Sequence, residues 1–205
     1  MEASQSWFEK NGFTLDAVLY HQDIIPFIKK YLFTSNFFTL SYLFLNLLFL
    51  VALLFSFYIQ ISSDTVKLFD SFTWFGFGCA LTFALVPIHE GLHGLAYKLC
   101  GAPSVSFAAN WKKLYFMAIA DKFVATRYPF YFIGSLPFLF ISLVLIVLTL
   151  LSNDGRQIML LSTLLIHTSM CAGDFGLMSY FAEKSNQQVA TYDDHQNSVT
   201  YFFVK

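Results

Sequence analysis

Residues 72–99 read FTWFGFGCALTFALVPIHEGLHGLAYKL. This run is long enough to cross a bilayer as a helix, which needs roughly 20 mainly apolar residues, yet it carries His89, Glu90 and His93 toward its end. An ionised side chain inside a bilayer costs roughly 3 kcal/mol or more unless it has a partner. The stretch therefore predicts a membrane-crossing helix with a polar site built into it.

The rest of the chain has the composition of a membrane protein. Of its 205 residues, 57% are hydrophobic, 12% are charged and 26 are Phe, and the mean hydropathy is +0.59. Three further apolar runs occupy residues 37–61, 128–151 and 158–181. Because backbone groups that face lipid must be paired internally, all four runs are predicted to be transmembrane helices. The 12 basic and 13 acidic residues form no basic field, which argues against a nucleic acid as partner.

We therefore expect an all-α integral membrane protein with a four-helix core over residues 37–182. Residues 1–36 are predicted to be a cytosolic or interfacial segment, and residues 183–205 a short cytosolic C-terminal tail. Within the first segment, residues 15–32 mix apolar residues with lysines, as an interfacial amphipathic helix would, although Pro26 opposes a helix there. Residues 104–120 have no helical period and are predicted to form a small cytosolic β-hairpin.

The basic residues indicate which side of the membrane faces the cytosol. Four spans put the N-terminal segment, residues 100–127 and the tail on one side, which carries ten of the basic residues: Lys10, Lys29, Lys30, Lys98, Lys112, Lys113, Lys122, Arg127, Lys184 and Lys205. The other side has only Lys67 and Arg156. Basic loops stay cytosolic, so we expect a multi-pass cell-membrane protein with both termini in the cytosol.

The sequence His89-Glu90-Gly91-Leu92-His93 is an HExxH motif. Residues four apart lie on one face of a helix, so the two imidazoles can converge on one zinc ion. Glu90 lies at the edge of the same site and can act as the base for a zinc-activated water. The motif therefore supplies two candidate metal ligands and a candidate catalytic residue.

A catalytic zinc needs a third protein ligand, and the run at 158–181 offers His167, Cys171 and Asp174. Their spacing would place them on one face of a helix. At about 1.5 Å of rise per residue, Asp174 and Cys171 lie level with the motif, whereas His167 lies roughly two turns too deep. Asp174 is favoured because an anionic oxygen suits a hydrolytic site and because Gly173 and Gly176 let a helix or a metal approach. Cys171 is the second candidate.

The chain also resembles a known family over roughly residues 83–205: the zincin membrane peptidases, formerly a domain of unknown function, which are distant relatives of the site-2 intramembrane metalloproteases. The matching motifs are PIHEGLHG at 87–94, GSLP at 134–137, CAGD at 171–174, YDDH at 192–195 and YFFV at 201–204. The resemblance implies that His89, His93 and Asp174 bind zinc and that Glu90 is the catalytic base.

We interpret the sequence as a membrane-embedded zinc metallopeptidase that cleaves a membrane protein or membrane-associated peptide and has the lipid bilayer as its surroundings. Two alternatives remain open. A non-catalytic scaffold, or pseudoprotease, would keep the zinc site for stability or partner binding. A zinc transporter would need ligands spread across the membrane, whereas the candidate ligands cluster at one depth.

Overall fold

The fold was analysed in a computed structural model, which describes residues 4–110 and 115–205. The described chain is mostly helical and divides into two compact units. The helical unit comprises Leu40–His89 and Phe138–Ala172, and the mixed unit comprises Met1–Thr39, Glu90–Pro137 and Gly173–Lys205. The division crosses helix α4 (Leu68–Leu99) between His89 and Glu90, inside the HExxH motif.

In the described part of the chain, three helices are long and apolar enough to cross a membrane: α3 (Phe37–Ser62), α4 and α5 (Arg127–Leu150). Their ranges agree closely with three of the four apolar runs. The fourth run is not one continuous helix, because α6 (Gly155–Met170) ends before Cys171 and α7 (Ala172–Glu183) follows it. Counted as one interrupted span, α6 and α7 bring the number of candidate spans to four.

The outer face of α3 is what a lipid-facing helix requires. Large apolar side chains recur at the spacing of one helical face and are exposed: Leu40, Leu43, Phe44 and Leu47. Exposed apolar side chains at this density are unfavourable in water but not in a bilayer. The exposure therefore agrees with the membrane protein expected from the composition.

Within the helical unit, α4 and α6 approach closely at a glycine. A Cβ on Gly78 would lie only 2.5 Å from the backbone oxygen of Met159 and would overlap the hydroxyl of Ser162. The hydroxyl of Thr163 donates to the Gly78 oxygen at 3.1 Å. Small residues and interhelical hydroxyl bonds of this kind hold transmembrane helices together, so this contact fixes α4 against α6.

The mixed unit contains a four-stranded antiparallel sheet in the order β1-β6-β5-β4. Its strands are β1 (Thr14–Tyr20), β4 (Ala125–Thr126), β5 (Val189–Asp194) and β6 (Val199–Val204). The expectation of a mostly helical protein is therefore met, but the all-α class is wrong, because this sheet is present in addition to the expected hairpin. Strand β1 comes from the N-terminal segment and pairs with the C-terminal β6, a pairing across almost the whole chain that local periodicity does not reveal.

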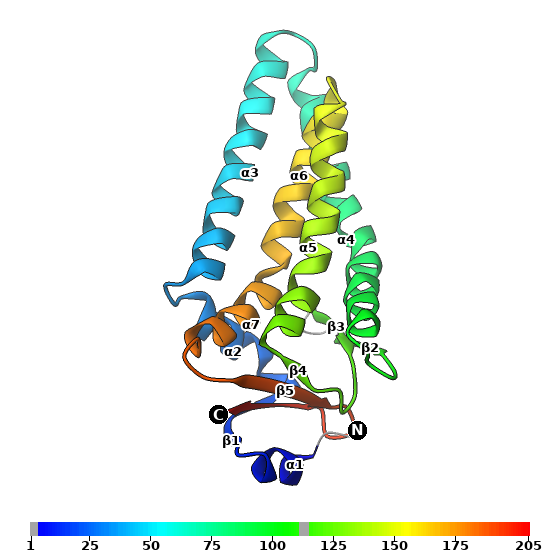
Figure 1. Cartoon of the computed structure of the whole chain (residues 1–205). Helices are drawn as coiled ribbons and strands as arrows, with labels where there is room; N and C mark the ends of the chain where they lie inside the picture. The colour runs from blue at the N-terminus through cyan, green and yellow to red at the C-terminus, as the bar shows by residue number, and fades with distance from the viewer. Residues whose placement is uncertain (1–3, 111–114) are drawn as a thin grey trace. The chain divides into compact units, whose positions relative to one another are not determined.

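Helices cover both faces of this sheet, as Figure 1 shows for α1 (Gln5–Lys10) on one face. Alternate residues of β6 point to opposite faces. Phe203 stacks on Phe8 of α1 with 4.1 Å between ring centroids. On the other face, Phe202 packs against Phe27 of α2 (Ile24–Leu32) and Tyr180 of α7. The aromatic residues of the tail thus pack on one face against α1, and on the other face against α2 and α7.

The amphipathic helix expected over residues 15–32 is only half correct. Its first part is strand β1, followed by the short 3-10 helix η1 (His21–Asp23), and only α2 is helical. Pro26 lies in the first turn of α2, where the missing N–H costs no intrahelical bond.

The expected β-hairpin is confirmed as β2 (Ser106–Asn110) paired antiparallel with β3 (Tyr115–Ile119). Its tip, residues 111–114, lies outside the described residues.

The end of β5 carries two acids with opposite environments. Burial raises the pKa of Asp193 to about 6, and the nearby Asp121 acts in the same direction, against the hydroxyl of Thr200, which donates to Asp193 at 2.6 Å. The ammonium group of Lys122 lies 2.6 Å from Asp194 and lowers the pKa of that carboxyl. Asp193 is thus a partly buried acid whose pKa is raised to about 6.

Candidate metal centre

The HExxH motif lies on α4, which continues without a break through Pro87 to Leu99. The helix therefore gives His89 and His93 the one-turn spacing that the sequence predicts. His93 is 9% exposed, and His89 and Glu90 are partly buried.

In the mixed unit, His93 is held at both ring nitrogens. Nδ1 lies 2.9 Å from the backbone oxygen of Ile133 in α5, and Nε2 lies 3.2 Å from Oδ1 of Asp174. A carbonyl oxygen only accepts, so Nδ1 donates to Ile133 and Nε2 is the ring atom that faces the carboxylate. With a metal ion bound, the neutral ring would offer the lone pair of Nε2 to it. A lone pair and a carboxylate oxygen this far apart suit two ligands of one cation, and a carbonyl on the other nitrogen is the usual support of a metal-binding histidine.

Asp174 lies in the first turn of α7, between Gly173 and Gly176. A Cβ on Gly176 would lie 2.9 Å from Cγ2 of Ile28, and one on Gly173 would lie 3.6 Å from Cδ1 of the same residue. The prediction of close approach is confirmed for Gly176, and the element that approaches is α2, whereas the distance at Gly173 is an ordinary van der Waals contact. Packing of α2 on α7 therefore fixes the helix turn that carries Asp174.

In the helical unit, His89 meets the two other candidates from the interrupted span. Nδ1 of His89 lies 3.2 Å from Nε2 of His167, and Sγ of Cys171 lies 3.9 Å from the same nitrogen. The depth estimate that put His167 about two turns too far from the motif is therefore wrong. Helical rise adds only along a continuous helix, and this span breaks at Cys171.

Two supporting features were not assigned from the sequence. The Ile133 carbonyl that holds His93 is a backbone group, which no side-chain pattern reveals. Gly134, the next residue, allows Met178 of α7 to pack closely, since a Cβ there would lie 3.2 Å from Cγ of Met178. The motif GSLP at 134–137 was the available signal that this turn of α5 is special.

The β-hairpin contacts the motif helix directly. A Cβ on Gly94, the residue after His93, would lie 2.9 Å from Cζ of Phe107 in β2 and 3.5 Å from Cγ1 of Val105. The ring of Phe107 is nevertheless 60% exposed. Strand β2 therefore lies next to the second histidine of the motif, and the ring of Phe107 occupies the space that a Cβ at position 94 would take.

A helical HExxH motif with a carboxylate beside its second histidine is the donor set of a zincin, a metallopeptidase class that binds zinc through imidazole and carboxylate groups. The chain belongs to the family described as “Putative zincin peptidase”, whose sequence profile matches residues 82–189. This family membership makes the protein a metallopeptidase by class and implies zinc as its metal. No curated protein and no solved structure is significantly similar to the chain.

Proposed function

We propose that the protein is a membrane-embedded zinc metallopeptidase in which His89, His93 and Asp174 hold the metal and Glu90 is the catalytic base. The observation that carries the proposal is the pairing of His93 with Asp174, at 3.2 Å, while the Ile133 carbonyl fixes the other ring nitrogen. The spacing of the motif on α4 supports His89 as the third ligand. Two imidazoles and one carboxylate leave a position open for a substrate or water, as a catalytic site needs.

Zinc bound there would act as a Lewis acid, which polarises the scissile carbonyl and makes water more acidic. Glu90 would carry out the proton transfers. The carboxylate of Glu90 takes a proton from the attacking water as the new carbon–oxygen bond forms. It then delivers that proton to the amide nitrogen as the carbon–nitrogen bond breaks. Glu90 follows His89 directly on α4, which keeps its carboxylate near the metal ligands.

The substrate would be an extended segment of a membrane protein or membrane-associated peptide, because a helix hides its amides and must unwind before cleavage. Strand β2 is suited to hold such a segment. Among the described residues, β2 pairs only with β3, so its other edge offers N–H and C=O groups to an added strand. The contact of Phe107 with Gly94 ties that edge to the motif helix.

We further propose that the mixed unit faces the cytosol. Its sheet joins residues 14–20, 125–126 and 189–204, so the N-terminal segment, the end of the hairpin loop and the tail belong to one sheet. This grouping supports the topology inferred from ten basic residues against two.

The decisive variant is Glu90→Gln, compared with wild type for zinc content and for cleavage of a membrane-tethered reporter in proteoliposomes. Because Glu90 is a base and not a ligand, the variant should keep its zinc and lose turnover. Gly91→Ala is the matched control, since Gly91 is exposed and a Cβ there meets nothing within 4 Å; it should retain both properties. Cleavage by Glu90→Gln at the wild-type rate would overturn the proposal.

A further inference from the structure

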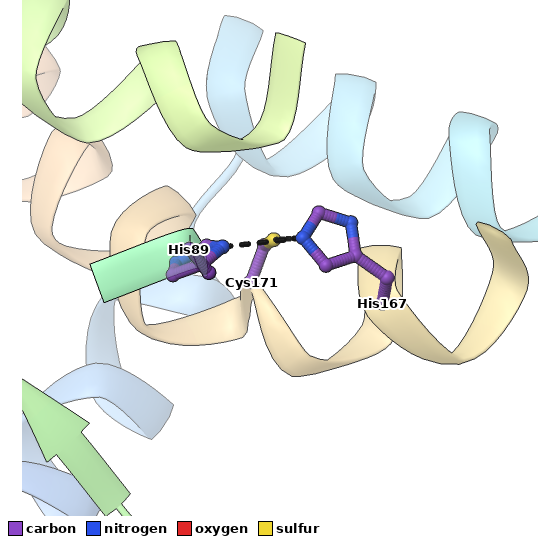
Figure 2. Close-up of side chains that lie close together, drawn as sticks. All are labelled: His89, His167 and Cys171. Carbon is purple, nitrogen blue, oxygen red and sulfur yellow. Dashed lines mark hydrogen bonds between the residues drawn. The ribbon is translucent and has the colours of Figure 1, made fainter. Parts of the chain in front are cut away.

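A second group of metal-ligating side chains lies in the helical unit and shares only His89 with the proposed catalytic set. His89 comes from α4, His167 from the last turn of α6, and Cys171 directly follows that helix. One ligand atom from each lies within 4.8 Å of the others. Figure 2 shows the three side chains turned toward one another. His167 and Cys171 are almost fully buried, at 3% and 1% exposure.

The backbone holds this group in place from two directions. His167 and Cys171 are four residues apart, and the Cys171 N–H donates to the His167 carbonyl at 3.1 Å, so the last turn of α6 presents both side chains on one face. The close contact of α4 and α6 at Gly78 fixes His89 opposite them. The carbonyl end of a helix attracts cations, which favours a positive ion at this position.

The spacing of the donors suits a metal ion. Two nitrogens or a nitrogen and a sulfur bound to one tetrahedral ion lie roughly 3.3–3.6 Å apart, given bond lengths of about 2.0–2.3 Å. The distances found are 3.2 Å between the two imidazole nitrogens and 3.9 Å between Nε2 of His167 and Sγ of Cys171. The third pair, His89 and Cys171, has its ligand atoms within 4.8 Å of each other, so side-chain movements of about 1 Å would bring all three donors to the spacing that a tetrahedral ion needs.

We propose that His89, His167 and Cys171 form a second metal site that takes a thiophilic transition-metal ion. Two imidazoles with one thiolate are soft donors, which select Zn2+, Cu+ or Cd2+ over hard ions such as Mg2+ and Ca2+. The proposed catalytic set has a carboxylate in place of the thiolate and uses His93 instead of His167. The two sites thus differ in two of three ligands and in softness.

Sharing His89 makes the two sites alternatives, a consequence that rests on the proposed peptidase function. An ion bound by His167 and Cys171 also takes His89 as its ligand. His89 is then not available to bind the catalytic metal. A thiophilic ion in excess would therefore inhibit the peptidase through a residue, Cys171, that has no part in the reaction.

Binding is tested with Co2+ in a full-length variant that lacks the catalytic donors, His93→Ala with Asp174→Ala. We expect one Co2+ per chain and a near-ultraviolet thiolate-to-cobalt charge-transfer band. Cys171→Ser and His167→Asn, each added to that background, should remove the band or weaken binding at least about tenfold. Cys79→Ser and Cys100→Ser are the matched controls and should keep it. Circular dichroism of every variant separates a lost site from a lost fold.

Absence of the band in the folded background variant, or its survival in Cys171→Ser, would overturn the site. This arm needs no peptidase activity, so its failure leaves the proposed function untouched. The second arm titrates reporter cleavage with Cd2+. Wild type should be inhibited, and Cys171→Ser should need at least about tenfold more Cd2+. Equal inhibition of the two proteins would overturn the link between the sites, while lack of any cleavage by wild type would count against the proposed function alone.

Discussion

Alanine at Gly78 and alanine at Gly76 are the same substitution on the same helix, and the structure predicts opposite results. A Cβ on Gly78 would approach the Met159 carbonyl to 2.5 Å, about 0.9 Å inside ordinary contact distance, whereas a Cβ on Gly76 meets nothing within 4 Å. A backbone oxygen cannot rotate away as a side chain can. Helices α4 and α6 must therefore separate in Gly78→Ala, and only in that variant.

The difference between the two variants isolates the packing cost. Each gains about 1 kcal/mol from replacing glycine in a helix, and this gain cancels in the comparison. Overpacking of a close contact typically costs about 1–3 kcal/mol. At about 2–4 °C per kcal/mol for a chain of this size, Gly78→Ala should unfold roughly 5 °C below Gly76→Ala.

The assay is thermal unfolding in detergent micelles, followed by circular dichroism for wild type and both variants. Gly76→Ala should unfold at or slightly above the wild-type temperature. Equal unfolding temperatures for the two variants would refute the close approach of α4 to α6. That result would also remove the support that this contact gives to the position of His89 beside His167.

Three other predictions concern the mixed unit and its orientation. In Gly94→Ala the new Cβ displaces the exposed ring of Phe107, so the KM for a reporter should rise severalfold while zinc content and unfolding temperature stay unchanged. An unchanged KM would show that β2 takes no part in substrate binding. The pKa of Asp193 is raised from 3.8 to about 6, so the folded state favours the protonated carboxyl. The free energy of unfolding therefore has its largest contribution from Asp193 below about pH 4, and it falls by about 3 kcal/mol as the pH rises through 6. Asp193→Asn should flatten the unfolding temperature across this window, and an unaltered pH profile would contradict the burial of this acid. In a variant without native cysteines, Lys10→Cys should react with an impermeant reagent only from the cytosolic side and Asp154→Cys only from the opposite side, and the reverse pattern would invert the topology.

The helices and the motif could be predicted from the sequence because their signals are local. An apolar run must be helical if it faces lipid, and the HExxH spacing has a meaning only on a helix. The hairpin of β2 and β3 was predictable for the same reason, since its strands are neighbours in the chain. Prediction worked wherever the interacting residues were close in sequence.

The remaining features depend on contacts between distant residues. Strand β1 is defined by pairing with β6 at the other end of the chain, and all of its 7 residues except Thr14 lie in the range that predicts an amphipathic helix. The break at Cys171 has no proline to announce it, although two glycines follow closely. That break decides the placement of His167, because it invalidates a depth counted along one straight helix. The Ile133 carbonyl that orients His93 carries no side-chain signal at all.

X-ray absorption at the zinc edge tests the proposed ligand set most directly. The measurement uses the purified wild-type protein loaded with one equivalent of Zn2+. If His89, His93 and Asp174 hold the first equivalent of zinc in preference to the site of His89, His167 and Cys171, the spectrum contains only nitrogen and oxygen neighbours, at about 2.0–2.2 Å. A sulfur neighbour at about 2.3 Å would contradict that set and place the zinc on a cysteine instead.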